Sequence, residues 1–345
     1  MKTNTMKPKK RIDAPGDFLQ IRDFLMKTYA MNPRANNWLI DRWNFCRYVS
    51  QTFHKTTDIW PETLGIWVDE QGDICAVVNS EGENQGEGFF QFRPGSRFDD
   101  ATMHELIDHA EWFFRCKIPG KQGRNQRETE IGAELINLRV NPFDAQLKRL
   151  LRARGFVRQN WNESTLSISL DSLPFTSDIP ELPSSEFSIA DGTRFSDSIR
   201  GLAHGLAFGY YSNNHASDNT AESAFRSMRS APDYQDYLDL SILDTTGAVA
   251  CFATFWYDRV NRIAVLEPLG TIPEYRRRGL AKALVYEGMR RLSRLGSTKL
   301  FVGSDQQFYY SVGFKMEYKK EIWQKTWPGQ AAAGTGSSEE LANGI

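Results

Sequence analysis

The chain has 345 residues, which is long for one domain and sufficient for two domains of about 150 residues each. Its formal net charge of −1 argues against a general nucleic-acid-binding protein, which needs a strong basic excess. No segment approaches the roughly 20 apolar residues that cross a bilayer, and the basic N-terminus lacks the apolar core of a secretory signal. The four cysteines lie far apart without a C-x-x-C spacing, as in reduced cytosolic proteins. We therefore expect a cytoplasmic protein with no nucleic-acid or membrane partner.

Segments without hydrophobic periodicity divide the chain. Residues 171–186 carry three prolines and five serine or threonine residues, a composition typical of linkers. Residues 1–17 form a basic N-terminal segment, and the small, polar residues of 328–345 predict a disordered tail. Two units remain, 18–170 and 187–327.

In the first unit the pattern predicts strands and helices of an α/β unit. The expected elements are strands in 64–78 and 86–92, a helix over 99–114, a strand over 134–140, a helix over 142–154 and a last strand after Gly155-Phe156. The aromatic-rich segment 36–43 is predicted to pack against the helices of this unit. His104 and His109 are about 140° apart around a helix, so they cannot bind one metal ion together.

The second unit is predicted to end in the same way as the first. Its expected elements are a strand near 187–190, helices around 196–208 and 220–230, strands at 237–243, 248–257 and 262–270, a helix over 279–295, a strand at 299–304, a short helix, and a last strand after Gly313-Phe314. Strand, helix, Gly-Phe and strand thus occur twice. The two units are predicted to be diverged copies of one α/β unit.

Three arginines precede Gly279, where the long helix of the second unit begins. The first N–H groups of a helix lack internal acceptors, and the helix dipole adds positive charge there. A phosphate can accept several of these N–H groups if no side chain blocks its approach, which Gly279 and the small Ala281 ensure. Arginine side chains can neutralise the phosphates. The segment therefore predicts a diphosphate site at the start of this helix.

Arg276-Arg277-Arg278-Gly279-Leu280-Ala281 resembles the R/Q-x-x-G-x-G/A signature of the GNAT acetyltransferase superfamily. The segment from Tyr309 to Phe314 resembles its Y-x-x-x-G-F signature. The resemblance is specific over 187–327 and extends to 18–170 only in the order of elements. It implies an α/β (α+β) protein with two tandem GNAT-like domains, each a mixed, mostly antiparallel sheet flanked by helices.

The resemblance also implies a co-substrate and a reaction. Acetyl-CoA is the expected co-substrate, without a metal, and the acceptor is expected to be a primary amine of a small molecule or peptide. The cofactor-binding residues that it implies are Leu269, Gly270, Thr271, Arg276, Arg277, Arg278, Gly279, Leu280, Ala281 and Lys282. The expected function is an N-acetyltransferase; the alternative is a non-catalytic acyl-CoA-binding regulator or scaffold. The sequence does not indicate the oligomeric state.

Two residues are candidates for catalysis by the same resemblance. Glu267 is expected to deprotonate the acceptor ammonium, or alternatively to pair with a nearby arginine. Tyr309 is expected to protonate the departing CoA thiolate, or alternatively to be a core residue. His215, with Tyr210 and Tyr211, lies on a loop that borders the acceptor site in this family, but a solvated loop histidine is the simpler interpretation.

The first unit departs from the family pattern. Asp99 and Asp100 stand at its helix start, where they would repel a phosphate. Leu151 stands four residues before Gly155, as Tyr309 stands four before Gly313. The first unit is therefore predicted to be a degenerate, non-catalytic copy that packs on or shapes the acceptor site.

Overall fold

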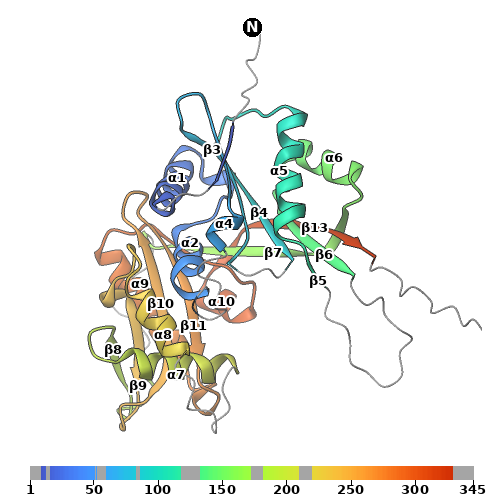
Figure 1. The fold of residues 1–345 in the computed structure, drawn as a ribbon. Helices are drawn as coiled ribbons and strands as arrows, with labels where there is room; N and C mark the ends of the chain where they lie inside the picture. Colours follow the sequence, from blue (N-terminus) through green and yellow to red (C-terminus); the bar gives the residue numbers. More distant parts are fainter. Residues whose placement is uncertain are drawn as a thin grey trace, which may run out of the picture.

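The computed structural model describes residues 9–12, 16–50, 52, 60–82, 86–117, 133–171, 182–209 and 220–328 (Figure 1). Most of the predicted linker, the predicted tail beyond 328, and the loop with Tyr210, Tyr211 and His215 lie outside these residues. Among the described residues, no helix combines the length and apolarity that crossing a bilayer needs.

The described part of the chain forms one 13-stranded mixed sheet with helices packed on it. The strands run in the order β1-β2-β3-β4-β6-β13-β7-β12-β11-β10-β9-β8, and β5 pairs beside β6. Most neighbours are antiparallel, and the exceptions are the parallel pairs β4–β6 and β11–β12. The predicted fold class, a mixed and mostly antiparallel sheet flanked by helices, is confirmed.

The first half contributes twelve of the elements labelled in the described residues: β1 (Lys9–Ile12), α1 (Asp17–Met31), α2 (Ile40–Phe45), α4 (Trp60–Thr63), β2 (Gly65–Val68), β3 (Ile74–Asn79), β4 (Glu87–Phe92), α5 (Asp100–Phe113), β5 (Cys116–Lys117), β6 (Glu134–Val140), α6 (Ala145–Ala153) and β7 (Val157–Ser169). The second half contributes β8 (Ser188–Asp191), α7 (Asp197–Phe208), α8 (Thr220–Met228), β9 (Asp239–Leu243), β10 (Val249–Asp258), β11 (Ile263–Thr271), α9 (Leu280–Arg294), β12 (Lys299–Val302), α10 (Gln307–Val312) and β13 (Lys315–Trp327).

The predicted repeat is visible in matching hydrogen bonds near the end of each half. Gly155 and Gly313 both adopt the left-handed conformation after a helix, with φ of 82° and 110°. The N–H of Phe156 donates to the carbonyl of Leu151 at 3.0 Å, and that of Phe314 donates to the carbonyl of Tyr309 at 3.1 Å. Leu151 therefore occupies the position that corresponds to Tyr309, as the sequence predicts.

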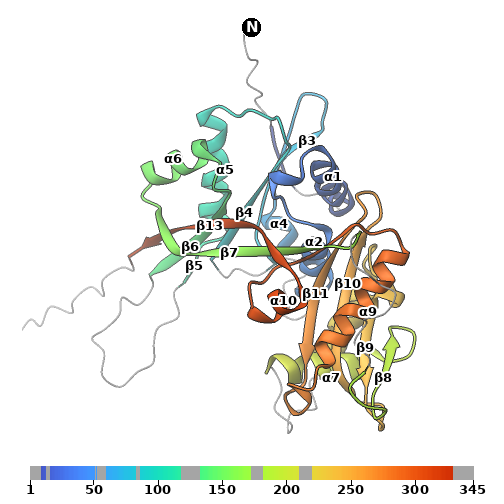
Figure 2. The ribbon, with the colours of Figure 1, turned by 180° about the vertical axis from the view of Figure 1, so that it is seen from behind.

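The two halves exchange their last strands. Strand β13, at the end of the second half, lies between β6 and β7 of the first half, with Trp323 opposite Leu138 (Figure 2). Strand β7 in turn pairs with β12, with Ile168 opposite Leu300. The side chain of Trp323 packs in the core of the first half, and that of Ile168 packs in the core of the second. Each half therefore pairs with a strand that belongs to the other half. The predicted domain boundaries at 170 and 187 remain predictions.

A second contact joins the halves through helices and side chains outside the strand exchange. Met26 and Ile40 from the first half pack with Phe225 of α8 and Trp256 of β10. Beside them, the buried carboxylate of Asp233 accepts hydrogen bonds from Arg22 at 2.7 Å and from Asn44 at 2.7 Å. The halves are thus held together by sheet pairing, apolar packing and an ion pair.

The strand exchange predicts that the stability of the first half depends on a residue of the last strand. Trp323 is 1% exposed and belongs to the last strand, yet it fills the core of the first half. Trp323→Ala should lower the free energy of unfolding by about 3–5 kcal/mol, because a large side chain leaves a cavity. Urea denaturation should show one transition for the whole chain, since β13 of the second half pairs within the strands of the first half in one continuous sheet.

The matched control is Trp112→Ala, because Trp112 is 73% exposed. This change should alter the free energy of unfolding by no more than about 0.5 kcal/mol. Two separate unfolding transitions, with only one shifted by Trp323→Ala, would contradict the strand exchange.

Candidate functional site

The start of α9 presents unobstructed backbone N–H groups. Gly279 is the N-cap residue with φ of 79°, and no side chain caps the helix. A Cβ atom placed on Gly279 would meet no atom within 4 Å. The positive end of a helix of 15 residues is therefore open to an anion at this point.

The three arginines before Gly279 differ in what they contact. The guanidinium of Arg276 donates to the carbonyl of Thr271 at 3.1 Å and to that of Ala207 at 2.8 Å, so it ties the loop to the end of α7. Arg277 and Arg278 are exposed and form no ion pair with any described residue. Arg278 lies over the ring of Tyr275, 5.6 Å from its centroid. Arg277 and Arg278 are thus the arginines that are available to an anion.

Several other predicted cofactor residues pack inside the protein. Leu280 is 1% exposed in the core of the second half. A Cβ atom on Gly270 would lie 2.3 Å from the ring of Phe252, so glycine is needed there for packing. Leu269, Thr271 and Ala281 are partly buried, and Lys282 is exposed. Leu280 and Gly270 can reach a ligand through their backbone atoms alone.

Tyr309 lies on α10 and is 8% exposed. Its ring packs against those of Phe308 and Phe314, in the core of the second half. Burial raises the pKa of Tyr309 above its usual range, and the negative charge of Glu267 raises it further. Tyr309 is therefore a core residue that also lies within electrostatic reach of Glu267.

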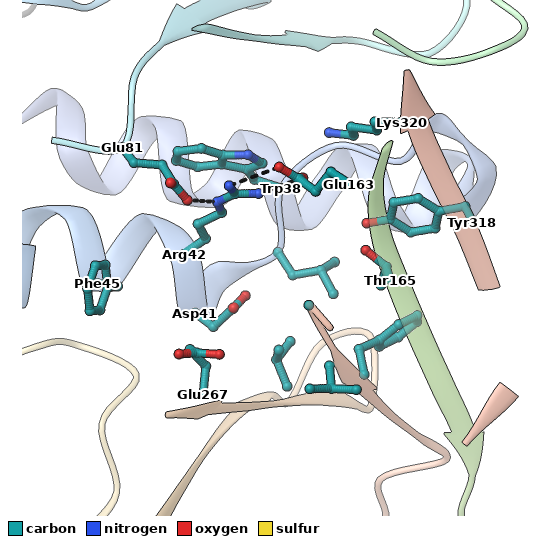
Figure 3. A pocket seen from close by; sticks show the side chains of 15 residues that line it. Trp38, Asp41, Arg42, Phe45, Glu81, Glu163, Thr165, Glu267, Tyr318 and Lys320 are labelled. Atoms are coloured by element: carbon teal, nitrogen blue, oxygen red, sulfur yellow. Dashed lines mark hydrogen bonds and ion pairs between the residues drawn. The ribbon is translucent and has the colours of Figure 1, made fainter. Parts of the chain in front are cut away.

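Glu267 lies on β11 at an irregularity in its pairing with β10, between the pairs Ala253–Leu269 and Phe255–Leu266. The indole N–H of Trp256 donates to the backbone carbonyl of Glu267 at 2.7 Å. Its side chain points into a cavity, and no described residue forms an ion pair with it (Figure 3). The predicted alternative, pairing with a nearby arginine, is not seen in the described residues.

The cavity lies at the junction of the two halves and has a volume of about 290 Å³. Residues of α2, β7, β11, β12 and β13 contribute to its walls (Figure 3). The lining residues are Trp38, Leu39, Asp41, Arg42, Phe45, Glu81, Glu163, Thr165, Val265, Glu267, Phe301, Val302, Gly303, Tyr318 and Lys320. Both halves therefore build it.

Glu267 and Asp41 are the carboxylates of this cavity whose pKa values are raised. Burial raises the pKa of Glu267 to about 7, and the charge of Asp41 adds to the shift, although water reaches Glu267 through the cavity. Burial also raises the pKa of Asp41 to about 6, against the opposing effect of Arg42. In Figure 3 the two carboxylates point toward one another. A proton near neutral pH can therefore be held or released at this pair.

The sequence did not indicate the cavity residues other than Glu267. Segment 36–43 was predicted only to pack the first half. Trp38 and Trp43 do pack in that core, but Trp38 also lines the cavity together with Asp41 and Arg42. The one feature of the sequence that could have indicated the cavity is the charged pair Asp41-Arg42 within this aromatic-rich segment.

The corresponding helix start in the first half is closed by its own side chains, in agreement with the prediction from Asp99 and Asp100. The carboxylate of Asp99 accepts from the N–H of Thr102 at 2.8 Å and caps α5. Asp100 accepts from Gln146 at 3.0 Å and pairs with Arg149 at 2.6 Å. The start of α5 is therefore acidic, and the carboxylate of Asp99 already caps it.

Comparison with known proteins agrees with this geometry. The sequence model of the Acetyltransferase (GNAT) family matches residues 208–314. No curated protein matches the chain significantly. The fold is similar to a GCN5-related N-acetyltransferase from Sphaerobacter thermophilus, with a TM-score of 0.56 and 16% identity over 93% of this chain and 96% of that one. It is also similar to a tandem GNAT protein from the clavulanic acid biosynthesis pathway, with a TM-score of 0.59 and 13% identity over 93% and 98% of the chains. Residues 208–314 therefore match the sequence model of the GNAT acetyltransferase family, and the fold of the chain as a whole is similar to that of a tandem GNAT protein.

Proposed function

We propose that the protein is an acetyl-CoA-dependent N-acetyltransferase that acts in the cytoplasm on a primary amine. The observation that carries this proposal is Glu267. It lies on the strand that leads to the Gly279 loop, its side chain faces the cavity, and its pKa is raised to about 7. A general base is most effective when its pKa is near the working pH.

The start of α9 fits the diphosphate of CoA. The open N–H groups beyond Gly279 would donate hydrogen bonds to its phosphate oxygens, and Arg277 and Arg278 would neutralise its charge. Bound there, acetyl-CoA supplies an acyl thioester. Arg276 would act indirectly, since its guanidinium already holds the loop against α7.

Glu267 and Tyr309 would carry the proton transfers. Glu267 would take a proton from the acceptor ammonium, directly or through water, so that the amine can attack the thioester carbon. A C–N bond forms as the C–S bond breaks, the hydroxyl of Tyr309 would protonate the sulfur, and the second proton that leaves the nitrogen would restore the Tyr309 hydroxyl. The raised pKa of Tyr309 ensures that this hydroxyl carries its proton at neutral pH.

Gly279→Val should abolish CoA binding, because the β-branched side chain would occupy the space in front of the helix start. The wild-type protein should gain about 2.7 kcal/mol of stability from CoA at 100 times its Kd, which thermal denaturation measures. Gly155→Val is the matched control. Gly155 has φ of 82° and equally open surroundings, but it lies in the first half. An undiminished CoA shift in Gly279→Val would show that the diphosphate binds elsewhere.

Tyr309→Phe should lower kcat by about 10² to 10⁴ and leave CoA affinity nearly unchanged, because it removes only the acid. Release of free CoA thiol in the presence of a panel of amines measures the rate. Tyr310→Phe, on the same helix but 37% exposed, is the control. If Tyr309→Phe lowers the melting temperature but not the rate per folded molecule, Tyr309 is a core residue only.

Glu267→Gln should remove the acidic limb of the pH profile of kcat/KM. In the wild-type protein, activity should fall as the pH drops below about 7, because Glu267 becomes protonated and can no longer accept a proton. Desolvation is the main cause of this raised pKa, the charges of Asp41 and Glu81 raise it further, and Arg42 lowers it. An unchanged acidic limb in Glu267→Gln would exclude Glu267 as the base.

CoA binding without thiol release for any amine would instead favour the alternative function, a non-catalytic acyl-CoA-binding regulator or scaffold.

A further inference from the structure

The charged groups of the cavity fall into those that pair with one another and those that do not. Arg42 donates to Glu81 and to both oxygens of Glu163, the latter at 2.8 and 3.2 Å. Arg139 donates to Glu163 at 3.3 Å and to Glu87 at 2.5 Å. Both oxygens of Glu163 are therefore occupied by arginines.

Lys320 is the unpaired cation of this site. It lies on β13, it is 3% exposed, and its ammonium has neither a hydrogen bond nor an ion pair with a described residue. Burial lowers the pKa of Lys320 to about 8, while Glu163 opposes the shift. In Figure 3 the side chain of Glu163 lies next to Lys320, with both carboxylate oxygens already bound by arginines, and Tyr318 and Thr165 farther along carry hydroxyls. Because Glu163, the anion nearest to it, is already shared by two arginines, the largely buried Lys320 side chain would be stabilised by a ligand that supplies a further anion.

Asp41 and Glu267 form the opposite, acidic end of the cavity. They face one another in Figure 3, and neither forms an ion pair in the part of the chain that the structure describes. Arg42 offsets their charge only in part, because Glu81 and Glu163 already bind its guanidinium. A positive group between Asp41 and Glu267 would relieve the repulsion between them.

We propose that the acceptor is a small zwitterion, a primary amine that also carries a carboxylate, with its amine between Asp41 and Glu267 and its carboxylate on Lys320. This inference rests on the proposed acetyltransferase function. It assigns Asp41 and Lys320 as the residues that determine specificity. Because Asp41 comes from the first half, that half would supply part of the acceptor site.

Other acceptor classes fit the cavity less well. A simple amine would leave Lys320 unpaired, and a peptide N-terminus has no carboxylate close to its amine. The volume of about 290 Å³ is at the small end of ligand pockets, which span about 300–1,000 Å³. Acetylation forms a C–N bond, breaks the C–S bond and sends the ammonium proton to Glu267. The product amide no longer has a positive charge to pair with Asp41, which would favour its release.

Matched pairs of amines test the proposal. L-serine and 2-amino-1,3-propanediol differ in a carboxylate, as do 4-aminobutyrate and 4-amino-1-butanol. In thiol-release assays, at least one carboxylate member should have a kcat/KM about 10 to 100 times that of its alcohol partner, the range expected for a charge-assisted hydrogen bond. Lys320→Met should bring this ratio to within about threefold of one. Lys319→Met is the control, since Lys319 is exposed on the same strand, and it should keep the wild-type ratio.

Asp41→Asn separates the two ends of the cavity. It should raise the acceptor KM of both members of a pair by about tenfold or more without changing their ratio. Lys320→Gln replaces Lys320→Met if the latter does not fold. Equal activity on both members, a preference for the alcohols, or a preference that survives the loss of Lys320 would overturn the zwitterion proposal and leave the acetyltransferase intact.

Failure of the proposed acetyltransferase function would give a different result from failure of the zwitterion proposal. In that case CoA would raise the melting temperature but no amine would release thiol. Calorimetric titration of the CoA-bound protein with the same pairs then decides the present proposal. Tighter binding of a carboxylate member that is lost in Lys320→Met would support it, and equal binding by the two proteins would overturn it.

Discussion

The pairing of β13 between β6 and β7 joins the two halves into one sheet and positions the cavity between them. It completes the sheet of the first half with the last strand of the second. Because β-strand side chains alternate between faces, this pairing turns Lys320 to the cavity and leaves Lys319 exposed. Thr165 of β7 and Glu267 of β11 reach the same cavity. The junction of the halves is therefore where a site can form that neither half could build alone.

Negative charge lies on β11, and positive charge lies on the loop that follows it. The open start of α9, with Arg277 and Arg278, is positive and suits a phosphate. Glu267, on the strand before it, faces Asp41 in a cavity with excess negative charge at that end. An anionic co-substrate and a cationic amine would thus be drawn to adjacent places. The first half lacks this arrangement, because Asp99 and Asp100 occupy the start of α5.

The sequence predicted the features that depend on residues close together in the chain. The loop before α9, the Gly-Phe turns and the repeated order of elements follow from local spacing. The strand exchange could not be predicted, because hydrophobic alternation shows which residues form a strand but not which strand they pair with. Asp41 and Lys320 were missed for the same reason, since they meet only through that pairing. Gly270 was predicted to contact the cofactor, but its packing under Phe252 is visible only in three dimensions.

We expect one site in each chain, with CoA on the second half and the acceptor cavity at the junction. Hydrogen–deuterium exchange with and without CoA measures this directly. CoA should slow the exchange of the backbone amides in 277–283, at the start of α9, and leave exchange unchanged in 97–103, at the start of α5. Equal protection of both segments, or protection of 97–103 alone, would contradict it.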